Sequence, residues 1–176
     1  MKGLFIKLLL ITAIFSFSIV FVYSQTMPNV ENGVAYELPY AGLLPDHPLY
    51  IFKVARDQFT LWSTRDYLKK AQLYLLYSDK RLVMGQQLIK RGKSKLAITT
   101  VSKGEKYFLK IPDMLETTRE QGAEATQDFV NKVKLSNVKH IEIIEKMAKE
   151  VPQGEENSLT ATLNLSLQIR EKLKKF

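Results

Sequence analysis

The sequence of 176 residues contains no cysteine and only two histidines, His47 and His140. Without cysteine the chain has no thiol nucleophile, no zinc–cysteine or iron–sulfur site, and no N-terminal cysteine for lipid attachment. Neither histidine is followed three or four residues later by another histidine or a carboxylate, so no helical metal-binding pair is present. A serine nucleophile elbow and a Glu-x-x-His motif are also missing. We therefore expect no metal, no cofactor and no catalytic residue.

Charge is missing from residues 8–22, which read LLLITAIFSFSIVFV and follow Lys2 and Lys7. A basic start, an apolar run and a suitable cleavage site before Gln25 are typical of a secretory signal peptide, here residues 1–24. The alternative is an uncleaved N-terminal anchor, because the apolar stretch approaches the roughly 20 residues of a membrane helix. In both cases the lysines stay in the cytoplasm, and the body is expected to be extracytoplasmic, either secreted or held at the outer face of the membrane.

The leader also lacks acidic residues, so removing it leaves 24 basic and 18 acidic residues, a formal net charge of +6. This charge has two interpretations. It either serves solubility, since lysine and glutamate are mixed along the helices, or it attracts anionic wall polymer or lipid headgroups. No polybasic block is present, which favours solubility.

The rest of the chain is expected to be all-α. Residues 25–46 contain prolines and glycines without periodicity and predict an extended linker and docking strip. Residues 47–176 predict an antiparallel bundle of four to five long amphipathic helices joined by short connections. The expected helix starts are marked, in chain order, by Asp46, the hydroxyls of Ser63 and Thr64, Ser94, a residue between Gly122 and Thr126, and Asn157 or Ser158.

Apolar spacing supports each helix. The first is indicated by Leu49, Phe52, Phe59 and Trp62, and the second has a heptad seam of Leu68, Ala71, Leu75, Ser78, Leu82, Gly85 and Ile89. The third has the seam Ala97, Val101, Gly104, Phe108, Ile111 and Leu115, and Pro112 should kink or end it. Glycines within the seams at positions 85 and 104 indicate either close helix crossings or weak points in the helices.

The most specific feature is the strip of residues 36–50, which leads directly into the first helix. Its prolines and aromatic residues predict a segment that either lies on the bundle and fixes the entry of the helix, which we favour, or offers a recognition surface. His47 is expected to stabilise this segment rather than to bind a ligand. The candidate docking residues are Tyr36, Leu38, Pro39, Tyr40, Leu44, Pro45, Asp46, His47, Pro48, Leu49, Tyr50 and Lys53.

The run Leu44-Pro45-Asp46-His47-Pro48-Leu49-Tyr50, with Lys53 and a long charged helical segment after it, resembles an uncharacterised bacterial domain of unknown function. The resemblance covers residues 36–105. It implies a helical body in an exported or membrane-anchored protein, and it implies no catalytic residue.

A cluster of Tyr67, Tyr74 and Tyr77 beside basic residues suggests either stacking against a ligand or, as we favour, the rim of the core. Export disfavours nucleic acid as a partner. We therefore expect a non-catalytic interaction or scaffold module of the cell envelope, whose partner is an envelope protein or a second copy of the chain. The alternative is an electrostatic binder of anionic wall polymer or lipid headgroups.

Overall fold

The computed structural model describes residues 34–176, so the predicted leader and the first part of the linker lie outside the described residues. Within this range the chain is all-helical, without a strand, as the sequence predicts. The helices are α2 (Tyr50–Ser63), α3 (Tyr67–Lys90), α4 (Ser94–Phe108), α5 (Lys110–Glu120), α6 (Gln127–Glu150) and α7 (Glu156–Leu173).

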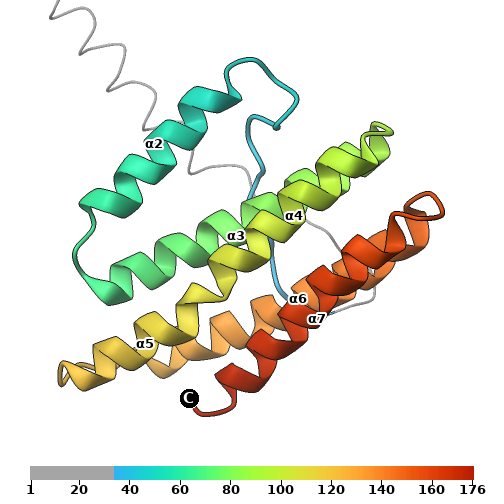
Figure 1. Cartoon of the computed structure of the whole chain (residues 1–176). Helices are drawn as coiled ribbons and strands as arrows, with labels where there is room; N and C mark the ends of the chain where they lie inside the picture. Colours follow the sequence, from blue (N-terminus) through green and yellow to red (C-terminus); the bar gives the residue numbers. More distant parts are fainter. Residues whose placement is uncertain (1–33) are drawn as a thin grey trace, which may run out of the picture.

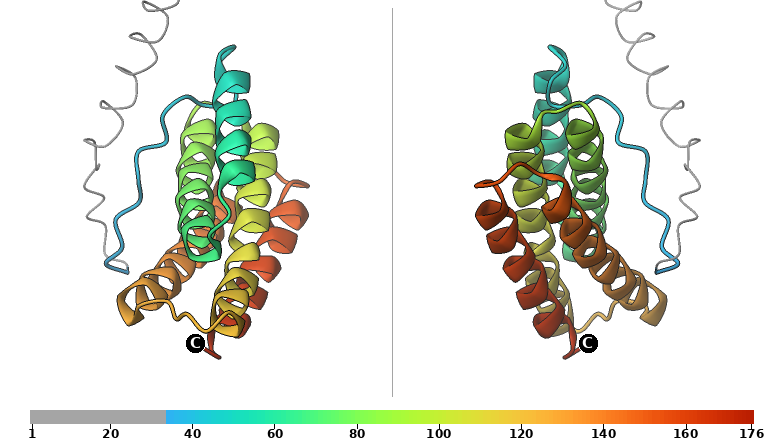
Figure 2. Two further views of the ribbon diagram at one scale, coloured as in Figure 1. Left: turned by 90° about the vertical axis from the view of Figure 1, so that its left-hand side faces the viewer. Right: turned by 90° about the vertical axis from the view of Figure 1, so that its right-hand side faces the viewer.

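Two antiparallel helix pairs, α3 with α4 and α6 with α7, form the bundle (Figure 1). Helix α3 also packs against α5 and α6, and α7 packs against α4. Helix α2 lies on the outer side of the α3–α4 pair (Figure 2). Residues 34–49 run along the flank of the bundle and lead into α2 (Figure 2). None of the helices between residues 34 and 176 is both long and apolar enough to cross a bilayer.

The expected third helix is divided into α4 and α5 at Leu109. Pro112 lies in the first turn of α5, where its missing N–H leaves no helical bond unmade. Its ring would clash with the carbonyl group of Phe108 in a continuous helix, so the chain breaks just before it. The predicted interruption by Pro112 is confirmed, and both halves keep their buried seam residues.

Several predicted caps are wrong. Helix α2 begins after Leu49, and the carboxylate of Asp46 instead pairs with two basic side chains after α3. The start of α3 is capped by the side chain of Asp66, which accepts from the Lys69 N–H, and not by a hydroxyl. The predicted N-caps of α4 and α7 are wrong as well, because Ser94, Asn157 and Ser158 already lie within the helices.

Both seam glycines lie at a close crossing of α3 and α4. A Cβ atom added to Gly85 would lie 2.2 Å from Val101 Cγ2, and one added to Gly104 would lie 3.0 Å from Arg81 Cβ. The lost helix propensity, about 1 kcal/mol per glycine, is therefore offset by packing that a larger residue would prevent. The close-crossing interpretation is confirmed.

The core of the bundle consists of two large apolar clusters with a polar layer between them, and a small third cluster of Ala41, Leu44 and Met84 joins the strip to α3. One cluster lies toward the α3–α4 loop and includes Leu82, Leu88, Val101, Ile144 and Met147. The other lies toward the α5–α6 loop and includes Leu75, Phe108, Ile111, Val133 and Ile169. The buried polar residues between them come from four helices: Ser78, Asp79, Glu105, Ser136, Asn137, His140, Thr162 and Ser166.

Candidate functional site

The predicted docking strip packs on its own bundle. Leu38 joins the first apolar cluster, and Ala41 and Leu44 pack against Met84 of α3. The strip is therefore primarily a structural element, the interpretation that the sequence favoured. Its candidate residues divide by exposure: Leu38 and Leu44 are buried, Tyr36, Pro39, Pro45, Asp46, Tyr50 and Lys53 are half-buried, and Tyr40, His47, Pro48 and Leu49 are exposed.

Polar contacts fix both ends of the strip. Near its start, the Val34 N–H donates to Glu142 Oε2 (3.2 Å). Near its end, Lys53 Nζ donates to the carbonyl oxygens of Ala41 (2.6 Å) and Leu43 (3.3 Å). Burial lowers the pKa of Lys53 to about 8, and nearby basic side chains act in the same direction. Lys53 thus joins α2 to the turn that precedes it.

The two polar residues before α2 have local structural roles. Asp46 Oδ2 accepts from Lys93 Nζ (2.8 Å) and from Arg91 Nη1 (3.1 Å), and this pairing lowers the pKa of Asp46. His47 Nδ1 accepts from the Leu49 N–H (3.1 Å). The segment before α2 is therefore connected to the α3–α4 loop, and His47 stabilises the turn.

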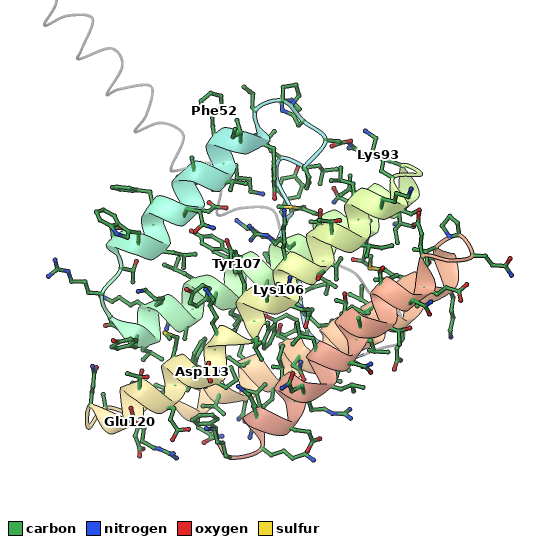
Figure 3. The ribbon with its side chains drawn as sticks, viewed as in Figure 1. Phe52, Lys93, Lys106, Tyr107, Asp113 and Glu120 are labelled. Carbon is green, nitrogen blue, oxygen red and sulfur yellow. The ribbon has the colours of Figure 1, made fainter. Side chains whose placement is uncertain are left out.

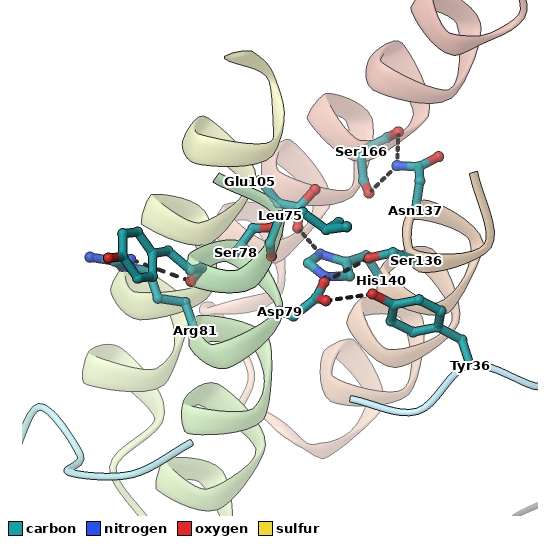
Figure 4. A network of polar contacts seen from close by, with 11 residues as sticks. Tyr36, Leu75, Ser78, Asp79, Arg81, Glu105, Ser136, Asn137, His140 and Ser166 are labelled. Carbon is teal, nitrogen blue, oxygen red and sulfur yellow. Dashed lines mark hydrogen bonds and ion pairs between the residues drawn. The ribbon is translucent and has the colours of Figure 1, made fainter. Parts of the chain in front are cut away.

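The polar layer contains a hydrogen-bonded chain that starts in the strip (Figure 4). The Tyr36 hydroxyl donates to Asp79 Oδ2 (2.6 Å), and the Ser136 hydroxyl donates to Asp79 Oδ1 (2.7 Å). His140 lies between two carboxylates, with Nε2 2.9 Å from Asp79 Oδ1 and Nδ1 2.5 Å from Glu105 Oε1. A chain of four side chains thus connects the strip to α3, α6 and α4.

His140 is held in its charged form. Burial alone would lower its pKa, but the charges and hydrogen bonds of Glu105 and Asp79 outweigh burial and raise the pKa to about 9. The His140 ring also packs against Phe108 in a T-shaped arrangement, with ring centroids 5.0 Å apart. Burial and the bond to Asp79 raise the pKa of the Tyr36 hydroxyl as well.

The hydrogen-bonded series of Tyr36, Asp79, His140 and Glu105 was not predicted from the sequence, because its members lie in the strip and on three different helices. Asp79 and Glu105 each follow a predicted seam residue by one position, Ser78 and Gly104, and His140 precedes the buried Ile141. A buried stripe wider than a strict heptad seam would have included them. No group of three or more acidic and histidine residues in the described chain has the geometry of a metal site.

An open groove of about 780 Å³ lies between the strip, α3 and α6. Apolar side chains line it, among them Leu76, Phe129 and Leu135, and Lys132 and Asp128 are its charged neighbours on α6. Asp79 and Tyr36 also line the groove, but every one of their side-chain oxygen atoms already has a hydrogen-bond partner.

One face of α2 carries the most exposed large apolar side chains of the described residues. Its side chains Ile51, Phe52, Phe59 and Trp62 are 68%, 69%, 64% and 79% exposed, and we call these four residues the outer face. Figure 3 shows Phe52 pointing away from the bundle. The rings of Phe59 and Trp62 lie 5.8 Å apart, so they form one aromatic surface.

The opposite face of α2 rests on the bundle through Tyr50, Asp57 and Leu61. Asp57 is buried and accepts from Arg56 Nη2 (2.7 Å). The apolar period of Phe52, Phe59 and Trp62 therefore predicts the helix correctly, but these residues face away from the core. Large apolar side chains gathered on one exposed face are typical of an interaction site.

Two of the three residues of the predicted tyrosine cluster belong to the core, whereas Tyr67 is half-buried. Tyr74 and Tyr77 are buried in the second apolar cluster, and the Tyr74 ring lies 5.7 Å from that of Tyr107. Lys110 Nζ lies over the Tyr74 ring at 5.2 Å, where it covers the ring from solvent. These rings are consequently not available as a stacking surface.

Comparison with known proteins adds one finding. Residues 42–154, from the middle of the strip to the turn after α6, match the model of a family described as a domain of unknown function, DUF5667. The match starts within residues 36–105, which carry the resemblance in the sequence, and continues past them to residue 154. No curated protein and no solved structure matches the chain. Since the family model covers more than half of its length, the chain belongs to the DUF5667 family.

Proposed function

We propose that the protein is a non-catalytic interaction module of the cell envelope and that its body lies outside the cytoplasmic membrane. The observation that carries the proposal is the outer face of α2, where four large apolar side chains are each more than 60% exposed. The other described helices turn most of their large apolar residues toward the core. A second surface that binds to the outer face would remove this apolar area from water.

The strip supports the same proposal because it gives α2 a fixed position. Lys53 holds the turn before α2, and Gln58 Nε2 donates to the Tyr107 hydroxyl of α4. A surface held in place before contact loses less conformational entropy on binding. The apolar leader of the sequence supports the extracytoplasmic location.

Photo-cross-linking in intact cells tests the proposal. A photoreactive phenylalanine analogue replaces Phe59 in one variant and Leu135, an exposed residue on α6, in a control variant. We expect a defined adduct from position 59 and none from position 135. Equal adduct formation from both positions would argue against α2 as the interaction surface. Protease added outside spheroplasts should degrade the protein, and full protection would contradict the extracytoplasmic location.

A further inference from the structure

We infer that the partner of the outer face of α2 is the surface of a lipid bilayer with anionic headgroups. This inference rests on the proposed function and specifies what the same surface binds. Helix α2 would lie in the plane of the bilayer, with Ile51, Phe52, Phe59 and Trp62 in the zone between headgroups and acyl chains. Its other face would stay on the bundle through Tyr50, Asp57 and Leu61.

The geometry of α2 fits an interfacial helix. Its 14 residues give a length of about 21 Å, and the apolar side chains of positions 51, 52, 55, 59 and 62 follow one face over this length. Tryptophan is enriched at the headgroup level of membranes, and tryptophan and phenylalanine are typical of the apolar face of an interfacial helix. Phe59 and Trp62 lie together at the C-terminal end of this face.

Charge around the face is complementary to an anionic surface. Residues 50–70 contain five basic and two acidic residues. Both acidic side chains are engaged within the protein, since Asp57 binds Arg56 and Asp66 caps α3. Arg65 and Lys69, just beyond Trp62, are exposed. Each basic residue near an anionic membrane adds to the attraction.

The same charge makes a second copy of the chain a poorer partner. Two outer faces packed together would bring the basic residues beside each α2 close to those of the other, and no exposed carboxylate of α2 could pair with them.

The position of the leader favours the membrane as well. Only eleven residues separate the apolar run of residues 8–22 from Val34, a reach of at most about 40 Å if the run is kept as an anchor.

Trp62, the single tryptophan of the chain, reports directly on this contact. The experiment uses the full chain with phosphatidylglycerol-containing or pure phosphatidylcholine vesicles, which carry brominated acyl chains as quencher. We expect the brominated lipid to quench Trp62 in anionic vesicles at least twofold more than in zwitterionic ones. Acrylamide, a neutral aqueous quencher, should lose access to Trp62 in the same samples.

Three variants identify the source of the signal. Phe52→Ser with Phe59→Ser should lower vesicle affinity about tenfold or more, because two large apolar side chains no longer leave water. Arg65→Gln with Lys69→Gln should reduce the preference for anionic vesicles. Leu135→Ser, which removes an exposed apolar side chain from α6, should change neither result.

Trp62 that stays open to acrylamide, and is not quenched by brominated lipid, would overturn the lipid assignment. Protection of Trp62 without vesicles that disappears on dilution would do so too, by identifying a second copy as the partner. Both outcomes leave the proposed function intact if position 59 still gives an adduct in cells. Loss of that adduct as well would overturn both proposals.

Discussion

The Tyr36 hydroxyl lies 2.6 Å from Asp79 Oδ2, and this hydrogen bond joins the strip before α2 to the buried polar layer of the bundle. Asp79 in turn contacts His140, which contacts Glu105. The strip, α3, α6 and α4 are thus connected through one chain of side chains. The position of the strip, and of the helix that follows it, depends on polar groups inside the core.

Removing the Tyr36 hydroxyl should destabilise the fold. Tyr36→Phe leaves Asp79 Oδ2 buried without its donor, and we expect a loss of about 1–3 kcal/mol in the free energy of unfolding. Urea denaturation followed by circular dichroism measures the loss. Tyr40→Phe is the matched control, since Tyr40 is exposed and its hydroxyl should contribute less than about 0.5 kcal/mol. Equal stability of Tyr36→Phe and the parent would contradict the role given to this bond.

The free energy of unfolding should fall as the pH rises from 6.5 to 8. The folded pKa of His140, about 9, lies above the unfolded value near 6.5, so its contribution is fully present below pH 6.5 and is lost as the pH rises through 9. The pKa of Lys53 is lowered to about 8 in the folded state, so charged Lys53 destabilises the fold at lower pH. This unfavourable contribution is relieved as the pH rises from 8 to 10.5, and the free energy of unfolding gains from it there, against the trend set by His140. Below pH 8 the contribution of His140 therefore dominates the slope.

Glu105→Gln provides the corresponding test of cause. Without the negative charge of Glu105, the pKa of His140 should fall toward its ordinary value, and the slope between pH 6.5 and 8 should become shallower. NMR titration of the His140 ring measures the pKa, and exposed His47 serves as the internal reference. An unchanged pKa of His140 in this variant would mean that Glu105 does not hold its proton.

Enlarging Gly85 should be unfavourable although alanine is the better helix former. The added Cβ would lie 2.2 Å from Val101 Cγ2, and such overpacking costs about 1–3 kcal/mol. Val101→Ala removes the methyl groups that would clash. In a double-mutant cycle monitored by urea denaturation, Gly85→Ala with Val101→Ala should therefore be more stable than the sum of the single changes. Additive effects would argue against direct contact at this crossing.

Lys53 should control the local opening of the turn before α2. Lys53→Met removes the donor to the carbonyl oxygens of Ala41 and Leu43 while keeping the apolar stem. Amide hydrogen exchange over residues 41–49 should become several-fold faster, with little change in α3. The same change at exposed Lys69 is the control, and equal exchange in both variants would contradict the contribution of Lys53.

Much of the helical framework can be predicted from the sequence. The buried residues of α3 and α4 follow the predicted seams at Ala71, Leu75, Val101 and Phe108, because periodicity reports directly on the face that a helix buries. The two glycine crossings follow from the same seams. Thr126, within the range expected for the start of the fourth helix, does cap α6 by accepting from the Phe129 N–H.

The contacts of single polar residues could not be predicted. Asp46 is a good capping residue, yet Arg91 and Lys93, more than 40 residues away in sequence, compete successfully for its carboxylate. Asp79 and His140 are likewise brought together only by the packing of α3 against α6. For α2, the apolar pattern is compatible with burial of either of two faces. The face with Tyr50 and Leu61 is the buried one because the strip places α2 with this face against the bundle.

Carbene footprinting in intact cells tests most directly whether the outer face of α2 is an interaction surface. Labelling of Phe52, Phe59 and Trp62 is compared with that of exposed Leu135, each normalised to the denatured protein. If the face is covered in the cell, these three residues should be labelled several-fold less than Leu135. Labelling equal to or above that of Leu135 would mean that the face stays open to water, and would contradict the proposed function.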